Sequence, residues 1–393
     1  MAKALDGLAT LDDSPALARP LRTVAALRLV LGLVALMGAI VFLEGTSWDI
    51  QWHTFIGRDR TLIPPHIMML GGIALSGIAG LLIVLIESRW ARRNQDIAQY
   101  SSGFATIFAG PLGSYIVGYA ALLAAVAFPL DAYWHALYGI DVAIWAPFHV
   151  MFISSMGIVT LGVAYVLASA AHLSARAGAS GLSIKRAATL GSVLALATFL
   201  SLFTLLLFDA LDDTHSINLG FMTLSAFPLL SSTLVAFTLA AAACAIPWRW
   251  AATLVGTCYI LLAGIMAVFV QPATAWLLAA EGLHYRQSPT FTSAVALDWF
   301  ITPLVVAILI DVVVRRAQRK HWSRGKLTLI LALSALLSGV LPVIPILPIL
   351  PIGLFIQWGL AGSLGSAIIG FAGAYLGAFF GRNVGESMSL LER

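Results

Sequence analysis

Two short stretches of the chain carry aspartate and histidine at matched spacings. Residues 48–66 read WDIQWHTFIGRDRTLIPPH, and residues 131–149 read DAYWHALYGIDVAIWAPFH. A shift of 82 residues superposes Asp131 on Asp49, Trp134 on Trp52, His135 on His53, Gly139 on Gly57 and Asp141 on Asp59. Each stretch then ends with a proline shortly before a histidine, which is His66 in the first and His149 in the second. In a chain with eight histidines this agreement indicates an internal repeat.

The spacing within each stretch suits a metal ion. An aspartate and a histidine four residues apart share one face of a helix, and the second histidine comes from the start of the next helix. Two imidazoles and one carboxylate suit Cu(II), Zn(II) or non-haem Fe(II), and three protein ligands leave a position open for water, dioxygen or substrate. The predicted ligands are Asp49, His53 and His66 in one site and Asp131, His135 and His149 in the other. Asp59 and Asp141 are predicted to orient an imidazole from outside the ligand set.

The alternative for these histidines is a structural role. A single histidine near a membrane surface more often forms a hydrogen bond within the protein than binds a metal. Structural hydrogen bonding does not require the same spacing twice, so the repeat favours metal binding. Trp52 and Trp134 precede the first histidine of each stretch. They are predicted mainly to anchor the chain at the membrane interface, and secondarily to form an apolar wall around the site.

The chain that carries these residues has the composition of an integral membrane protein. Of its 393 residues 60% are hydrophobic and only 10% are charged, and the mean hydropathy is +0.95. Apolar runs of about 20 residues, enough to cross a ~30 Å hydrocarbon core, recur along its length. The predicted fold is therefore an all-α, polytopic bundle of transmembrane helices, which excludes a soluble catalytic domain. Ten spans are predicted, at about 23–43, 66–87, 104–129, 143–171, 188–208, 219–246, 251–271, 292–313, 327–345 and 352–380.

The distribution of basic residues predicts the orientation in the membrane. Of 22 lysines and arginines only Arg58, Arg60 and Arg286 fall on the side of the two motifs. Because basic loops remain in the cytoplasm, both termini are predicted to be cytoplasmic and the metal motifs extracytoplasmic. The expected location is a bacterial cytoplasmic membrane, and the net charge of +4 does not indicate nucleic-acid binding. The predicted parts are a cytoplasmic tail at 1–22, a four-span metal-binding repeat region at 23–187 and a six-span membrane region at 188–393.

The C-terminal region has no second clear repeat, but three local patterns predict structure. Prolines recur every three residues over 342–351, which favours a polyproline II run that ends the ninth span. Asp311 is predicted to form an ion pair with Arg315 or Arg316. A ridge of small residues allows another helix to approach closely, either within the chain or at a homo-oligomer seam. The ridge consists of Gly373, Gly377 and Gly381.

The two stretches resemble the metal motifs of the C subunit of the particulate methane monooxygenase family, the copper membrane monooxygenases that include ammonia- and short-alkane-oxidising members. The family's first motif is similar to Asp49, Trp52, His53, Arg58, Asp59, Pro64, His66 and Ile67. Its other motif is similar to Asp131, His135, Asp141, Ala146, Pro147, Phe148 and His149. Asp131 stands where the family usually has asparagine. The resemblance covers about residues 25–175.

The resemblance implies copper, as one or two ions held by the six predicted ligands, with zinc and iron as alternatives. It implies a monooxygenase that oxidises a small apolar or weakly polar substrate with dioxygen. It also implies additional membrane or periplasmic subunits, because the family's C subunit works beside two others and this chain has no cupredoxin-like domain. Two other functions remain open. One is a non-catalytic membrane protein that binds, senses or transports metal, and the other is an assembly partner of a larger membrane complex.

Overall fold

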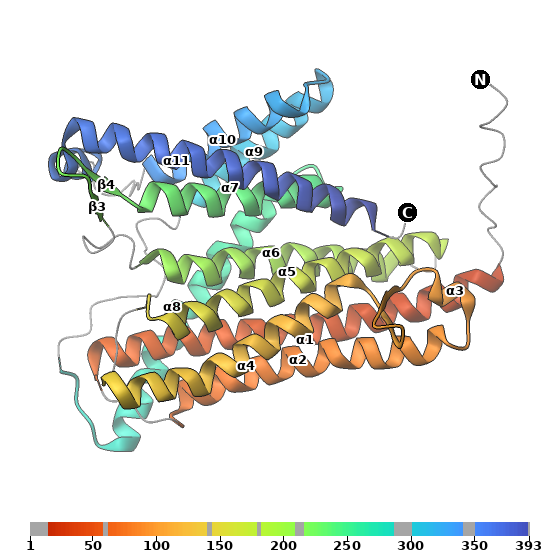
Figure 1. Ribbon diagram of the computed structural model, residues 1–393. Helices are drawn as coiled ribbons and strands as arrows, with labels where there is room; N and C mark the ends of the chain where they lie inside the picture. Colours follow the sequence, from red (N-terminus) through yellow and green to blue (C-terminus); the bar gives the residue numbers. More distant parts are fainter. Residues whose placement is uncertain are drawn as a thin grey trace.

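The computed structural model describes residues 15–57, 62–139, 144–178, 182–208, 216–286, 301–340 and 350–391. Within them lie eleven helices and two short antiparallel hairpins (Figure 1). The helices are α1 (Pro15–Phe55), α2 (Pro64–Ala91), α3 (Gln95–Ala98), α4 (Leu112–Tyr138), α5 (Pro147–Arg176), α6 (Leu182–Phe208), α7 (Phe227–Ala245), α8 (Ala251–Glu281), α9 (Thr302–Arg319), α10 (Arg324–Val340) and α11 (Leu350–Leu390). One hairpin pairs β1 (Ser102–Phe104) with β2 (Phe108–Gly110), and the other pairs β3 (Ser216–Asn218) with β4 (Thr223–Ser225).

Eight of the described helices are long and apolar enough to cross a membrane, so the chain is an integral membrane protein with an essentially all-α fold. The eight are α1, α2, α4, α5, α6, α7, α8 and α11. Two further helices, α9 and α10, lie where the eighth and ninth spans were predicted. They have 18 and 17 residues, and α9 carries one aspartate and three arginines. Eight of the ten predicted spans are therefore matched by candidates in the described part of the chain.

Some predicted span boundaries are wrong, because hydropathy does not distinguish an apolar hairpin from a helix. The span predicted at 104–129 begins inside the β1–β2 hairpin, where Ala105 and Thr106 have positive φ. The span predicted at 219–246 likewise begins inside the β3–β4 hairpin. The span predicted at 23–43 ends too early, because α1 continues as a helix to Phe55. This extension is the part of α1 that carries the first predicted metal ligands.

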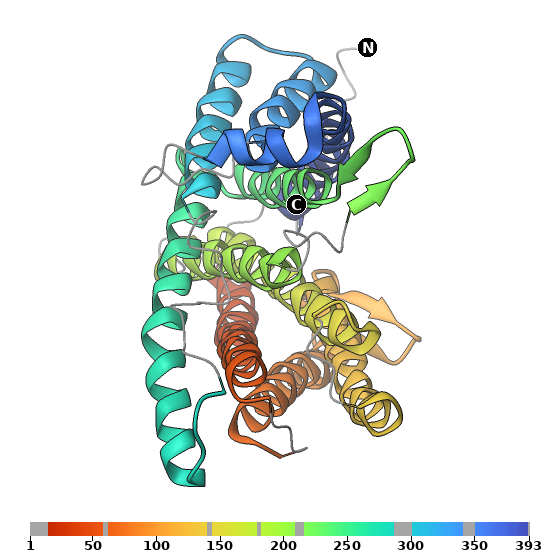
Figure 2. The same cartoon turned by 90° about the vertical axis from the view of Figure 1, so that its left-hand side faces the viewer.

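The long helices form two bundles that are joined by α8. The first bundle contains α1, α2, α4, α5 and α6, and the second contains α7, α9, α10 and α11 (Figure 1). Helix α8 runs along one side of both bundles and crosses the other helices obliquely (Figure 2). Ser47 of α1 donates a hydrogen bond to the sulfur of Met266, and Trp48 packs edge-on against Phe269. These contacts attach α8 to the part of α1 that precedes the metal ligands.

The glycine ridge of α11 packs against α7. A Cβ atom built on any of the three ridge glycines would collide with α7, at the backbone of Leu229, Thr233 or Phe237. Each later glycine of the ridge meets a later turn of α7, from Leu229 to Phe237, so α7 and α11 run parallel. The prediction that this ridge packs within the chain is confirmed, and the ridge is not available as a homo-oligomer seam.

A buried ion pair fixes the first bundle at the end opposite the predicted metal ligands. Arg28 of α1 and Glu87 of α2 are fully buried and form a two-point ion pair, with Arg28 Nε 2.9 Å from Glu87 Oε2. Arg28 also donates hydrogen bonds to the hydroxyl of Ser169 on α5 and to the carbonyl of Tyr100. A buried charge pair is tolerated when its remaining donors and acceptors are satisfied in this way. No local pattern in the sequence indicates this pair, because its members lie 59 residues apart.

The predicted ion pair of Asp311 is wrong. Its carboxylate accepts hydrogen bonds from the backbone N–H groups of Ala252 and Thr253 and from the Thr253 hydroxyl, in the first turn of α8. Negative charge is favourable at a helix N-terminus, where N–H groups lack partners within the helix. The guanidinium of Arg315 stacks over Trp250 instead, at 3.6 Å from the ring centroid. Asp311 therefore joins α9 to the beginning of α8.

Candidate metal centre

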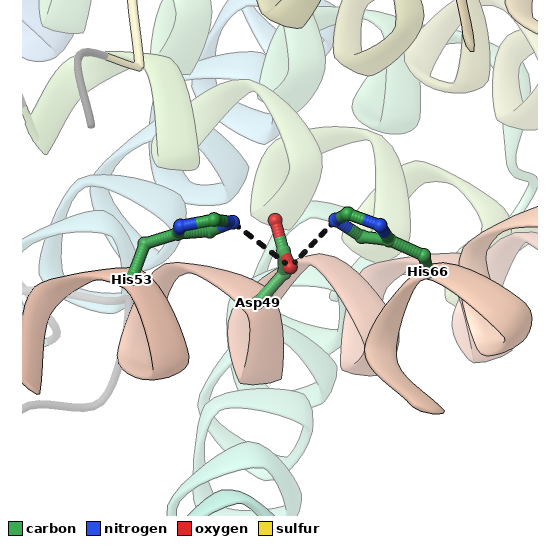
Figure 3. A group of neighbouring side chains, drawn as sticks. All are labelled: Asp49, His53 and His66. Atoms are coloured by element: carbon green, nitrogen blue, oxygen red, sulfur yellow. Dashed lines mark ion pairs between the residues drawn. The ribbon is translucent and has the colours of Figure 1, made fainter. Parts of the chain in front are cut away.

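The first group of predicted ligands comes from the end of α1 and the start of α2 (Figure 3). Asp49 and His53 lie one turn apart on α1, and His66 is the third residue of α2. Oδ1 of Asp49 is 3.0 Å from Nε2 of His66 and 3.5 Å from Nε2 of His53, and the carboxylate stands between the two rings. The three side chains are 10 to 15% exposed. We call this group the first triad.

The second group repeats this arrangement on the next pair of helices. Asp131 and His135 lie one turn apart on α4, and His149 is the third residue of α5. Nε2 of His135 is 3.3 Å from Oδ2 of Asp131, and Nε2 of His149 is 3.3 Å from Oδ1. We call this group the second triad. In each triad the ligand atoms lie within 4.8 Å of one another, so the six predicted residues form two groups that can hold a metal ion.

Each triad is closed by a chain reversal that begins at a glycine. Gly57 follows α1 with φ of +64° and Gly139 follows α4 with φ of +88°, and the two occupy matched positions of the repeat. Residues with a side chain rarely adopt this left-handed conformation, whereas glycine does so at little cost. A proline then starts each returning helix, Pro64 in α2 and Pro147 in α5, where its missing N–H leaves no helical bond unmade. The reversal brings a histidine back to the aspartate that precedes it.

A backbone carbonyl lies beside one ring of the second triad. Nδ1 of His135 lies 3.2 Å from the carbonyl oxygen of Gly139. A carbonyl oxygen only accepts hydrogen bonds, so this contact requires a proton on Nδ1, which leaves Nε2 as the nitrogen that faces Asp131. Metal-binding histidines are commonly oriented by such a bond from their other nitrogen. The contact with Gly139 is therefore compatible with a metal ion at Nε2 of His135.

Aromatic side chains lie between and beside the triads. The ring of His66 meets Phe128 of α4 edge-on, with 5.6 Å between centroids, and the ring of His149 lies 5.5 Å from Phe152. Asp49 of the first triad interacts electrostatically with His149 of the second. The two triads are therefore neighbours at one end of the first bundle, with phenylalanine rings against their histidines.

The two tryptophans of the motifs differ in their surroundings. Trp52 is only 1% exposed and belongs to a buried cluster with Phe55 of α1 and Leu277 of α8. The prediction of an interfacial anchor is therefore wrong for Trp52, because α8 covers it. Trp134 is partly buried and packs against Tyr138 and Phe148. Both rings fit the secondary prediction of an apolar wall beside the ligands.

Two predicted residues of the site lie outside the described residues. These are Asp59 and Asp141, which were expected to orient an imidazole in each triad.

Sequence reasoning missed a second carboxylate near the first triad, beside that of Asp49. Glu44 stands five residues before Asp49 on α1, is 7% exposed, and has no hydrogen-bond partner at either carboxylate oxygen. It shares a helix face with Ser47 and Trp48, which contact α8. Its only sequence signal is a single glutamate directly after the apolar run 23–43. Burial of an ionisable group within a membrane span is a default indication of function.

No protein family, no curated protein and no solved structure matches this chain.

Proposed function

We propose that this protein is a membrane-bound, copper-dependent monooxygenase-like protein that oxidises a small apolar or weakly polar substrate with dioxygen. The observation that carries the proposal is the duplicated triad, in which two helices supply two imidazoles and one carboxylate at each of two neighbouring places. Such a donor set suits Cu(II) among the common metals of oxygen chemistry. The resemblance of both motifs to those of the copper membrane monooxygenases supports the choice of copper over zinc and iron.

In this proposal the residues of the chain bind the ion and shape its surroundings. The aspartates and histidines hold the metal, and three donors leave positions open for dioxygen and substrate. A copper ion would supply the redox chemistry that activates dioxygen. Phe128 and Phe152, against the histidines, provide apolar contacts for a substrate that arrives from the lipid, and they limit the access of water.

The proposed orientation places both triads on the extracytoplasmic side of a bacterial cytoplasmic membrane. The opposite ends of the helices carry Arg89 at the end of α2, Arg92 directly after it, Arg176 on α5 and the arginines that end α9. Basic residues are retained in the cytoplasm, so this end is assigned to the inner side. We further propose that additional membrane or periplasmic subunits deliver electrons, because the sequence contains no haem or flavin motif.

The test is to purify the full chain from copper-supplied cells and measure its metal content and its oxidation chemistry together. Metal content is measured on the purified chain, and oxidation is measured on membranes of the same cells. These membranes receive a reductant, ¹⁸O₂ and one of three substrate types: short alkanes, short alkenes or ammonia. The proposal expects bound copper and ¹⁸O-labelled product, both lost in a His53→Ala/His135→Ala double variant and both kept in a His321→Asn control. His321 is exposed and lies outside both triads. Protein that binds no metal refutes the proposal, and copper-loaded protein without turnover, even with membranes of the source cells, favours a non-catalytic role.

Metal transport is a second candidate, and the position of Glu44 favours it. A cation that leaves the first triad toward the membrane interior would meet this buried carboxylate five residues from Asp49. Transport predicts metal flux into proteoliposomes that falls in a Glu44→Gln variant while the metal content of the triads is unchanged. Equal flux in the variant and the parent protein would remove this candidate.

A further inference from the structure

An apolar groove runs between α2 and α4, on the half of the first bundle away from the triads. It has a volume of about 460 Å³ and extends from Ile73 to Val84 on α2 and from Ser114 to Ala125 on α4. Eleven residues of helix correspond to about 16 Å, which is close to half of the ~30 Å hydrocarbon core. The length of the groove along the helices is therefore about the thickness of one leaflet of a bilayer. Its outer end stops about 10 Å before His66, so an occupant would not reach the metal ligands.

Small residues create the groove, and aromatic residues mark its inner end. A Cβ atom built on Gly118, in the groove wall, has no neighbour within 4 Å, so a side chain there would enter open space. Phe104 of the β1–β2 hairpin packs against Tyr115 and Tyr119 of α4, with ring centroids 5.4 and 5.9 Å apart. The Tyr115 hydroxyl donates a 3.0 Å hydrogen bond to the carbonyl of Ser102. Amphipathic rings of this kind gather at the level of lipid headgroups.

Arginines without acidic partners stand beside this inner end. Arg89 and Arg92 follow the groove residues Ile78 and Leu81 by eleven residues, which is close to three full turns. Arg89 is therefore on the groove face of α2, and Arg92, which caps α2 with helical φ and ψ, continues that face. Both are exposed, and no carboxylate pairs with either of them in the described residues. The nearby Glu87 is already paired with Arg28. Arg92 donates a hydrogen bond to the Ile107 carbonyl, which holds the hairpin over the groove.

We propose that this groove binds an anionic glycerophospholipid, with one acyl chain between α2 and α4 and the phosphate on Arg89 and Arg92. Three observations agree on this occupant. The groove is apolar and spans the thickness of one leaflet, aromatic rings lie at the headgroup level, and two arginines without acidic partners among the described residues lie directly beyond the rings. A neutral lipid would fill the groove equally well but would leave the positive charge of Arg89 and Arg92 uncompensated. Basic sites beside transmembrane helices bind anionic headgroups through the same combination of charge and apolar contact.

The experiment is native mass spectrometry of the detergent-purified full chain, titrated with phosphatidylglycerol and, separately, with phosphatidylcholine of the same acyl chains. The intact protein is expected to bind one phosphatidylglycerol at concentrations where phosphatidylcholine does not bind. The Arg89→Gln/Arg92→Gln variant should bind phosphatidylglycerol about thirtyfold more weakly, since each basic residue near a membrane surface contributes about fivefold. Gly118→Phe should lose the bound lipid because the new ring fills the groove.

Matched controls separate this site from general lipid affinity. Arg186→Gln removes an exposed charge from α6, and Gly264→Phe adds a ring to α8 at another glycine with open space around it. Both controls should bind phosphatidylglycerol as the parent protein does. The proposal is overturned if the two lipids bind equally, if the double arginine variant retains parental affinity, or if the controls lose as much affinity as the groove variants. The arginine variant changes only exposed side chains, so the test stands even if Gly118→Phe does not fold.

Discussion

Replacing His66 by alanine tests whether the first triad is a metal site. His66 supplies one of three donors, and it is the only one of the three that comes from α2, so an ion bound there links α1 to α2. Loss of a group that merely orients a metal ligand lowers affinity by about 10- to 100-fold. Loss of the ligand itself should exceed that range, which corresponds to more than about 2.7 kcal/mol. An ion present at about 100 times its dissociation constant stabilises the folded protein by a similar amount, so the variant should also lose metal-dependent thermal stability.

The assay is elemental analysis of the purified chain, combined with thermal unfolding in detergent with and without added copper. The two triads predict two ions per chain in the parent protein. His66→Ala should retain the ion of the second triad, and His66→Ala/His149→Ala should retain neither. His321→Asn, which changes an exposed histidine outside the triads, should match the parent protein. The interpretation of the triads as metal sites is refuted if His66→Ala keeps the parental metal content and its copper-dependent stability.

Three other substitutions give direct outcomes. Asp131→Asn keeps the shape of the side chain but removes its charge, so calorimetric titration should show copper binding to the second triad more than about tenfold more weakly. Copper binding to the first triad should be unchanged, and equal affinity at the second triad would exclude the carboxylate as a ligand. Glu44→Leu should raise the free energy of unfolding by about 1–3 kcal/mol, because a buried carboxylate without a hydrogen-bond partner is costly; a lower unfolding temperature would contradict this. Glu87→Gln should destabilise the protein by about 3–5 kcal/mol in denaturant unfolding, since it leaves the buried Arg28 charge uncompensated, and parental stability would show that the pair contributes little.

The geometry of the triads could be predicted because its determinants are local in the sequence. Asp49 and His53 are neighbours on any helix, and the proline before His66 indicates where the next helix begins. Gly57 and Gly139 occupy matched positions in the two stretches, and the structure shows that both have positive φ where the chain leaves the first helix of each pair. The alignment of the two stretches thus contained most of the information needed to place six side chains in two groups.

Features that depend on contacts between distant segments could not be predicted. Trp52 has the sequence context of an interfacial residue, and only the placement of α8 over it makes it buried. Asp311 had two arginines nearby in the sequence, but its partners are N–H groups about 58 residues away. Hydropathy also placed the start of α4 too early, because the β1–β2 hairpin is as apolar as a helix. For Trp52 and Asp311 the outcome depended on a tertiary partner that has no local signature, whereas the start of α4 was misplaced because hydropathy does not distinguish a hairpin from a helix.

The contact between α1 and α8 has a consequence for the order in which the protein matures. Ser47 and Met266 meet across 219 residues of sequence. At about 5 to 20 residues per second, a ribosome needs roughly 10 to 45 seconds to synthesise the intervening chain. During that interval the α1 helix has already emerged while the face bearing Trp48 and Trp52 lacks its cover. The surroundings of the first triad are therefore completed late in biosynthesis, whereas the triad's own ligands all lie within the short segment 49–66 and are translated almost together.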